Sequence, residues 1–144
     1  MESNQIIQEL KDKYRSIEIN KNSVTVAEEE LLPLMRQLRD VYGFNYLTDE
    51  TAVDYKDYFE IVYNVCRLCR GDMLMIKTKV DKEKAAVPSM FSIWPGAVWM
   101  EREIYDLMGI NFTGHPDMRR ILLDDNFEGH PLRKDFKWTG GREV

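Results

Sequence analysis

The last third of the chain places the strongest constraint on its fold. From Gly109 onward apolar residues lose any regular spacing, and two Gly-His-Pro triplets, at 114–116 and 129–131, interrupt the chain. A proline lacks a backbone N–H and holds the preceding residue extended, which excludes long helices and central strands there. A compact domain rarely holds about 30 residues of this kind unless they bind something. We therefore expect an extended partner-binding arm, residues 111–144, after an α+β domain, residues 1–110.

Helical patterns recur four times before this arm. Apolar side chains at helical spacing predict helices at 3–14, 28–42, a short segment at 88–94, and 95–108. Ser3 is the expected N-cap of the first helix, and Pro95 fits the first turn of the last one. Gly43 and Gly109 are the expected stops, because glycine tolerates the left-handed conformation that commonly follows a helix.

Strand patterns fill the rest of the domain. The clearest spans 57–68, where buried-type residues such as Phe59 and Ile61 alternate with others. Further strands are predicted at 44–54 and 73–80, and two short ones within 17–26 around a turn at Lys21-Asn22. Tight turns between successive strands favour antiparallel pairing. The sequence therefore predicts an α+β fold: a mainly antiparallel sheet with helices packed on one face, followed by an extended C-terminal arm.

Composition narrows the functional class. The chain has 144 residues, 44% hydrophobic and 31% charged, which suits one domain with its own core. A net charge of −5 argues against broad nucleic-acid binding, which needs a basic surface. No stretch reaches the roughly 18 apolar residues of a membrane span, and the N-terminus lacks a signal-peptide pattern. We expect a cytoplasmic protein that reaches a membrane only through partners.

Cys66 and Cys69 form a Cys-x-x-Cys pair, which raises a redox or metal hypothesis. The pair lies at the end of a predicted strand, where side chains three residues apart point to opposite faces. A structural zinc site needs four ligands and an iron–sulfur cluster needs about four thiolates, and the chain has two cysteines. Two small apolar side chains are the simpler interpretation, and a thiol- or metal-dependent protein stays open as an alternative.

His115 and His130 each precede a proline. With nearby aspartates they could bind a metal in principle, but no chelating spacing such as His-x-x-x-His is present. No serine or cysteine nucleophile stands in a recognised motif beside either one. An imidazole beside an extended backbone more commonly satisfies neighbouring backbone groups.

Charged residues are dense on the last predicted helix and along the arm. Arg102 and Asp106 are four residues apart and therefore share a helix face on which they can pair. Because this helix is apolar on several sides, we expect its charges at an interface or in buried ion pairs. The predicted partner interface comprises Glu101, Arg102, Glu103, Asp106, His115, Asp117, Arg119, Arg120, His130, Arg133, Lys134, Asp135 and Phe136.

The arm also supplies apolar residues. Aromatic side chains and arginines are the commonest anchors of protein interfaces. The expected apolar anchors are Phe112, Ile121, Leu122, Leu123, Phe127, Phe136 and Trp138. We predict that the arm packs against another chain, because it lacks an apolar periodicity that would bury it against its own domain.

Three blocks of this region resemble one known family. They are Glu101-Arg102-Glu103-Ile104-Tyr105-Asp106-Leu107-Met108-Gly109-Ile110, His115-Pro116-Asp117-Met118-Arg119-Arg120-Ile121-Leu122, and Gly129-His130-Pro131-Leu132-Arg133-Lys134-Asp135-Phe136. In sequence and order they are similar to the 30 kDa subunit of respiratory complex I, which is the bacterial NADH-quinone oxidoreductase. The same module occurs in energy-converting membrane-bound [NiFe] hydrogenases. Met108 and Met118 depart mildly from the family pattern.

The resemblance implies a non-catalytic assembly subunit of a membrane-bound oxidoreductase. Such a subunit holds no cofactor, while iron–sulfur clusters and a nickel–iron site or quinone belong to its partners. It implies docking on the large catalytic subunit, contact with the small iron–sulfur subunit, and an indirect link to the membrane arm. The chain would then lie on the cytoplasmic side of the cell membrane, held there by partners.

The short chain favours the hydrogenase type of complex, and the 30 kDa subunit of complex I is the alternative. A stand-alone redox protein using Cys66 and Cys69, and a free binding module with a disordered tail, are further alternatives from other classes. The electron donor, the electron acceptor and the pumped ion leave no trace in this sequence.

Overall fold

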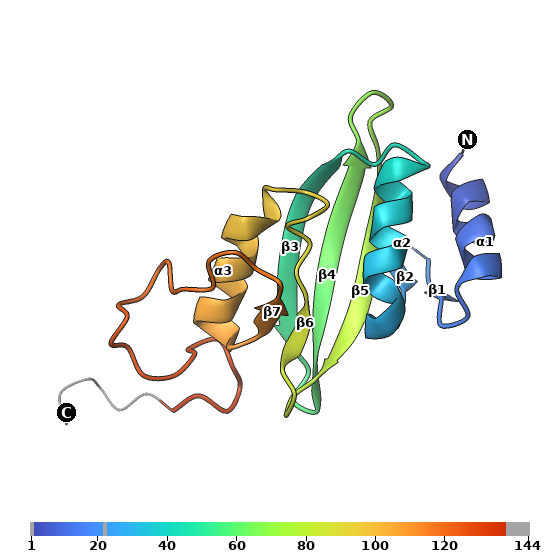
Figure 1. Cartoon of the computed structure of the whole chain (residues 1–144). Helices are drawn as coiled ribbons and strands as arrows, with labels where there is room; N and C mark the ends of the chain where they lie inside the picture. Colours follow the sequence, from blue (N-terminus) through green and yellow to red (C-terminus); the bar gives the residue numbers. More distant parts are fainter. Residues whose placement is uncertain (1, 22, 138–144) are drawn as a thin grey trace.

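The protein is known from a computed structural model that describes residues 2–21 and 23–137. Asn22 of the expected turn and the expected anchor Trp138 lie outside these residues. Figure 1 shows the elements in chain order. They are α1 (Ser3–Lys13), β1 (Glu18–Ile19), β2 (Val24–Thr25), α2 (Glu28–Asp40), β3 (Tyr46–Asp54), β4 (Tyr58–Arg67), β5 (Asp72–Asp81), β6 (Ala86–Pro88), α3 (Ala97–Met108) and β7 (Asn111–Thr113).

Five strands form one mixed sheet in the order β1-β2-β5-β4-β3. The hairpins β3–β4 and β4–β5 are antiparallel, as their short connections require. The pair β2–β5 is parallel, because the chain crosses over through α2 and two further strands between them. The predicted α+β class with a mainly antiparallel sheet is confirmed, and the parallel pair refines it to a mixed sheet.

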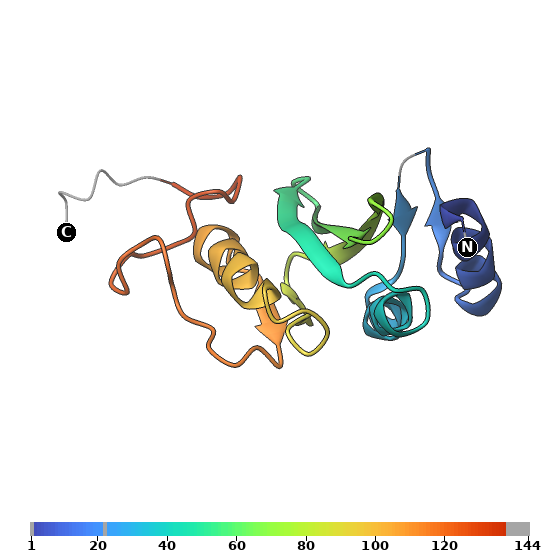
Figure 2. The ribbon, with the colours of Figure 1, turned by 90° about the horizontal axis from the view of Figure 1, so that it is seen from above.

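The core lies between the sheet and α2. The alternation predicted for β4 holds, because Phe59, Ile61 and Tyr63 are fully buried. Leu31, Leu34, Met35 and Leu38 supply the buried stripe of α2. In Figure 2, α2 lies over the sheet, while α3 flanks it beside β3 and α1 lies beyond β1 at the opposite edge. Helix α3 thus stands alone at the β3 edge, and the chain that follows it has only α3 and this edge to pack against.

One predicted helix is wrong. Residues 88–94 do not form a helix; instead Ala86–Pro88 form strand β6, which pairs in parallel with β7 (Asn111–Thr113) and brings Val87 beside Phe112. The side chain of Glu101 accepts hydrogen bonds from the Ser89 hydroxyl at 2.5 Å and from the Met90 N–H at 2.8 Å. These contacts come from residues distant in sequence, so local periodicity could not indicate them.

Two predicted helix starts are shifted by a residue or two. Glu2 rather than Ser3 is the N-cap of α1, and it forms a capping box with Gln5. Gly96 caps α3, so Pro95 precedes the helix instead of lying in its first turn. Such shifts at element ends are small because several residues near a boundary can adopt the same extended conformation.

Gly109 ends α3 in the left-handed conformation, with φ of 74°. Its N–H donates to the Tyr105 carbonyl at 2.8 Å. A Cβ at this position would lie 2.7 Å from Cδ2 of His130, which belongs to the arm. Glycine is therefore required twice here, for the backbone conformation and for the close approach of the arm.

We predict that Gly109→Ala destabilises the protein more than Gly71→Ala. Gly71 has a similar φ of 71°, but its added Cβ meets nothing within 4 Å, so only backbone strain of about 1 kcal/mol is expected there. At Gly109 the His130 ring must also move. Urea unfolding of the two variants measures the difference, and equal destabilisation would show that the contact between His130 and the helix end contributes nothing.

Candidate docking site formed by α3 and the C-terminal arm

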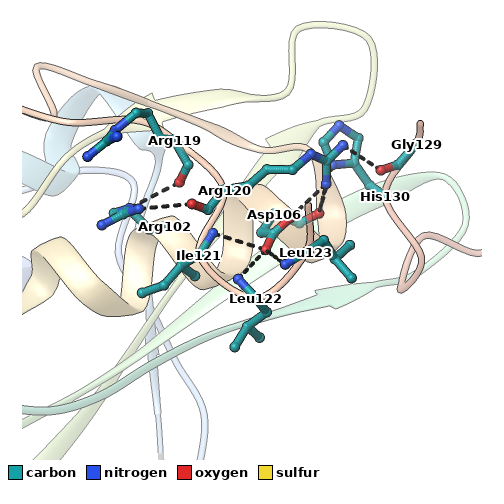
Figure 3. Close-up of polar contacts among 9 residues, drawn as sticks. All are labelled: Arg102, Asp106, Arg119, Arg120, Ile121, Leu122, Leu123, Gly129 and His130. Atoms are coloured by element: carbon teal, nitrogen blue, oxygen red, sulfur yellow. Dashed lines mark hydrogen bonds and ion pairs between the residues drawn. The ribbon is translucent and has the colours of Figure 1, made fainter. Parts of the chain in front are cut away.

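Asp106 is the point on α3 to which the arm is attached (Figure 3). Its side chain is fully buried. One carboxylate oxygen accepts hydrogen bonds from three successive arm N–H groups, those of Ile121 (3.2 Å), Leu122 (2.7 Å) and Leu123 (2.9 Å). The other oxygen pairs with Nη1 of Arg120 at 2.7 Å. A single side chain thus fixes four consecutive arm residues against the helix.

The charge of Asp106 is stabilised by these donors. Burial alone raises the pKa of the Asp106 carboxyl, but the Arg120 guanidinium and the N–H groups of Leu123, Leu122 and Ile121 bring it below its ordinary value. The carboxylate therefore stays ionised at neutral pH although no water reaches it. Its contribution to stability is present above the unfolded pKa of about 4 and is lost as the pH falls below that.

Arginines cross-link the arm to itself and to the helix. Arg102 donates to the carbonyls of Arg119 (3.0 Å) and Arg120 (2.9 Å). Arg120 donates in turn to the carbonyls of Asp106 (3.0 Å) and Gly129 (2.8 Å). Figure 3 shows these bonds around one turn of α3. The guanidinium fork suits this task, because it offers several donors in a fixed plane.

Both histidines hold backbone groups. The Nδ1 atom of His115 accepts from the Asp117 N–H at 2.9 Å, so its Nε2 carries the proton that is donated to the Val98 carbonyl at 2.9 Å. His130 contacts the Asp106 carbonyl through Nδ1 at 2.9 Å, and its ring lies edge-on to Tyr105. Over residues 2–21 and 23–137, no group of three His, Cys, Asp or Glu side chains is arranged to hold a metal ion.

A second attachment lies at the far end of β3. Asp54 accepts from the N–H of Lys134 at 2.8 Å and of Lys56 at 2.7 Å, and it pairs with Nζ of Lys82 at 2.9 Å. Burial raises the pKa of the Asp54 carboxyl, but these donors outweigh it and lower the pKa to about 2. Arg133 pairs with Asp135 at 2.9 Å and lies over the Phe59 ring. The arm is therefore held at both ends of its described length.

On the opposite side of α3, Glu101 and Glu50 form a buried carboxyl pair. Glu101 is fully buried and Glu50 is 3% exposed. Burial raises the pKa of Glu50 well above its ordinary value, and the negative charge of Glu101 raises it further. Burial also raises the pKa of Glu101, although the Met90 N–H and the Ser89 hydroxyl oppose this. At neutral pH the pair therefore retains a proton on Glu50, which hydrogen-bonds to Glu101 and joins β3 to α3.

The structure uses the sequence-predicted residues in unequal ways. The predicted pairing of Asp106 with Arg102 is replaced by pairing with Arg120, because the arm brings Arg120 closer. Glu101 and Asp106 are buried inside their own chain, so neither is presented to a partner. Among the remaining predicted residues, Glu103, Arg119, Lys134 and Asp135 are exposed, while Arg102, His115, Asp117, Arg120, His130, Arg133 and Phe136 are partly buried. That these residues contact a partner stays a prediction.

Sequence reasoning missed two residues of this region, Glu50 and Asp54. Both are acids at buried positions of an otherwise amphipathic strand. An acid on the apolar face of a strand is costly unless it is paired or protonated, and that misplacement was the signal available in the sequence.

Apolar side chains remain exposed on the surface made by α3 and the arm. Trp99 is 60% exposed, Leu122 61% and Leu132 59%. Together with Ile121 they contrast with the polar groups of the arm, many of which are paired within the chain. We call the surface formed by Trp99, Ile121, Leu122 and Leu132 the apolar docking face. Exposed clusters of large apolar residues commonly mark protein contacts.

The two cysteines lie apart in their environments. Cys66 is buried in β4, whereas Cys69 is exposed in the turn that follows. Neither forms a disulfide among the described residues. Among those residues, no helix combines the length and apolar character that crossing a bilayer requires.

Comparison with known proteins decides the family. Residues 24–142 match the family described as respiratory-chain NADH dehydrogenase, 30 Kd subunit. The chain belongs to this 30 kDa-subunit family. The corresponding subunit of NADH-quinone oxidoreductase from Moorella thermoacetica is 42% identical over 91% of this chain and 93% of its own length. The one from Geobacter sulfurreducens is 38% identical over 96% of this chain and 92% of its own length.

Solved structures agree with this fold. Nqo5, as its trypsin-resistant fragment, is 29% identical and has a TM-score of 0.74 over 81% of this chain and 99% of that one. A chain of an archaeal membrane-bound sulfane sulfur reductase is 26% identical, with a TM-score of 0.80 over 96% of this chain and 87% of that one. The resemblance noted from the three sequence blocks is thereby confirmed.

The relatives also bear on the expected type of complex. The Moorella protein has nearly the length of this 30 kDa-family chain, so shortness does not separate hydrogenase subunits from those of complex I. Because both relatives are named as subunits of NADH-quinone oxidoreductase, they favour the complex I alternative over the hydrogenase interpretation that came first.

We predict that Asp106→Asn releases the arm. The amide cannot accept as a charged carboxylate does, and breaking such a buried pair costs about 3 kcal/mol. Hydrogen exchange should show fast exchange at the amides of Ile121, Leu122 and Leu123, with the β4–β5 amides still protected. Asp125→Asn, at an exposed arm position, is the matched control and should leave exchange unchanged. Retained protection in the Asp106 variant would show that the arm is held by other contacts.

We predict that Glu50→Gln makes stability less dependent on pH. A pKa raised by folding contributes stability below the unfolded pKa of about 4.3, and this stability is lost as the pH rises. Glutamine keeps the shape and the donor without acquiring a buried charge, so the variant should be more stable than the natural chain at pH 8 by roughly 1–3 kcal/mol. Denaturant unfolding at pH 4, 6 and 8 measures this. Glu103→Gln, at an exposed position of α3, is the control, and a parallel pH profile for both variants would refute the shared-proton account.

Proposed function

We propose that this chain is the 30 kDa subunit of an NADH-quinone oxidoreductase of the complex I type. One observation carries the proposal: the corresponding subunits of such enzymes match it over nearly the whole of both chains, at 42% identity for the Moorella protein. A match of that extent leaves no room for a different domain with a different task in either protein. The chain itself acts as an assembly subunit without a redox site of its own.

The geometry of the described residues supports an assembly role. The acids and histidines that could have suggested catalysis are committed to holding the arm: Asp106 to four arm residues, and His115 and His130 to backbone carbonyls. Groups saturated in this way are poorly suited to proton or electron transfer to a substrate. Their effect is to hold the arm rigid so that the apolar docking face is presented in a defined shape.

A rigid apolar face suits a lasting protein contact. Trp99 and the leucines of the arm supply large apolar area, and Arg102 stacks on the Trp99 ring. Tryptophan and arginine are the residues that most often dominate interface energies. Because the face is already ordered by Asp106, little conformational entropy is lost on binding. We therefore assign this face to the large catalytic subunit, with the small iron–sulfur subunit as a further neighbour.

The redox groups then lie in those partners. Iron–sulfur clusters, and the quinone or nickel–iron site, are expected outside this chain, which holds the electron-transfer arm in register. Placement on the cytoplasmic side of the membrane, through partner subunits, follows from the same proposal. The name of the archaeal structural neighbour, a respiratory membrane complex, supports peripheral membrane association.

A second candidate is a subunit of a related membrane complex of the energy-converting hydrogenase type. The TM-score of 0.80 to a chain of a membrane-bound sulfane sulfur reductase favours it, because the same fold serves a complex with another substrate. Purification of the native complex through a tag on this chain, followed by mass spectrometry, separates the two. NADH-oxidising subunits among the co-purifying chains support the first proposal, and a nickel–iron subunit in their place supports the second.

We predict that Leu122→Ser lowers the yield of assembled complex while Leu68→Ser does not. Both leucines are 61% exposed, but Leu122 belongs to the apolar docking face and Leu68 follows β4 at the opposite end of the molecule. Loss of a buried leucine contact costs about 2 kcal/mol, which corresponds to roughly a thirtyfold weaker association.

Yield of tagged complex on a native gel, with circular dichroism of each isolated variant, measures this effect. Activity per assembled complex should stay unchanged in both variants. Equal yields from the two variants would contradict the assignment of the docking face. Loss of turnover in fully assembled complex would instead indicate that this chain takes part in catalysis.

A further inference from the structure

Strand β3 is a long edge strand whose outer side has no partner strand among the described residues. It ends the sheet order β1-β2-β5-β4-β3 and spans nine residues. Proteins normally cover or blunt such an edge, because its unpaired N–H and C=O groups attract another strand. In Figure 2, α3 runs beside this edge and the arm passes on the far side of α3.

The pairing pattern identifies the backbone groups that face outward. The Tyr55 N–H donates to the Tyr58 carbonyl at the hairpin, so this pair is hydrogen-bonded. Bonded and non-bonded pairs alternate along an antiparallel ladder. The register Thr51↔Val62 and Ala52↔Ile61 then places Ala52 and Glu50 at non-bonded positions. Their N–H and C=O groups point away from β4, toward the open edge.

A groove of about 260 Å³ lies along this stretch. One wall is the strand edge itself, residues 49–52. The other wall is α3, with Met100, Ile104 and Leu107, and Leu132 of the arm closes one side. A groove between a free strand edge and a helix is the geometry in which peptide-binding domains add an extended peptide as an extra strand.

The charges of the groove select the peptide. The titratable groups that line it are all acidic, namely Asp49, Glu50 and Glu103. Asp49 and Glu103 are exposed, and no cation is paired with either among the described contacts. Successive side chains of an added strand face opposite sides, so one residue would meet the apolar wall of α3 while the next meets Asp49. Charge complementarity therefore calls for lysine or arginine next to an apolar residue.

We infer that the edge of β3 at Glu50 and Ala52 binds an extended, basic segment of a partner subunit as a sixth strand of the sheet. The inference rests on the proposed function only in requiring a partner chain. It adds a second contact, distinct from the apolar docking face, and it would place main-chain hydrogen bonds where the isolated chain leaves them unmade.

Residue-resolved hydrogen exchange on the full chain, alone and within the purified complex, tests the inference. The Glu50 and Ala52 amides should exchange fast in the isolated chain and at least about tenfold more slowly in the complex. The Asp49 and Thr51 amides, bonded to β4, should be protected in both. Unchanged exchange at Glu50 and Ala52 in the complex, or protection already present in the isolated chain, would overturn the inference.

Two further measurements identify the bond and the occupant. Ala52→Pro removes one outward N–H and should lower the yield of complex about tenfold relative to Ala52→Val, which adds volume but keeps the N–H. With Thr51 replaced by p-benzoylphenylalanine, photocrosslinking in the complex should capture a partner peptide that holds lysine or arginine beside an apolar residue. Capture of residues 138–144 of the same chain or of a second copy, or equal yields from the two Ala52 variants, would overturn the inference.

The experiment also separates the two proposals. A chain that purifies without respiratory subunits refutes the proposed function. An assembled complex in which the groove amides still exchange freely refutes the sixth strand alone.

Discussion

A buried carboxylate must be met by donors, and Asp106 obtains four of them from the arm. The conformation of residues 120–123 is therefore imposed by a charge on α3, since these residues have no apolar periodicity of their own. Removing an ion from water costs several kcal/mol, which only well-placed donors can offset. The path of the arm, the closeness of His130 to Gly109 and the exposure of Leu122 all depend on this one interaction.

Helix α3 carries two buried acids that act in opposite directions. Glu101 faces the sheet, where it captures the chain after β6 and shares a proton with Glu50. Asp106, five residues later, faces the arm and stays ionised. The difference follows from the donors available: Glu101 meets another carboxyl, whereas Asp106 meets a guanidinium and three N–H groups. The helix thus joins the domain to the arm through one shared proton and one buried charge.

This division explains how a subunit without chemistry of its own can serve an enzyme complex. The polar residues that stand out in the sequence are largely consumed in shaping the arm, and what remains for a partner is apolar surface and an unpaired strand edge. Both are ordered before binding, so association costs less entropy than folding of a disordered tail would. Family membership rests on the sequence matches, while the way the surface is built rests on the geometry.

The sequence by itself determined the α+β class, the strands β3 to β5, the helices α1 and α2 and the glycine stop of α3, because each follows from local periodicity or from one residue's backbone freedom. It also located the charged blocks of α3 and the arm. Only the tertiary structure decided that Asp106 pairs with Arg120 instead of Arg102, that Ala86–Pro88 form a strand, and that Glu50 meets Glu101. These contacts join residues from 14 to 51 positions apart, and their strength comes from burial, which a sequence does not record until the chain has closed around them.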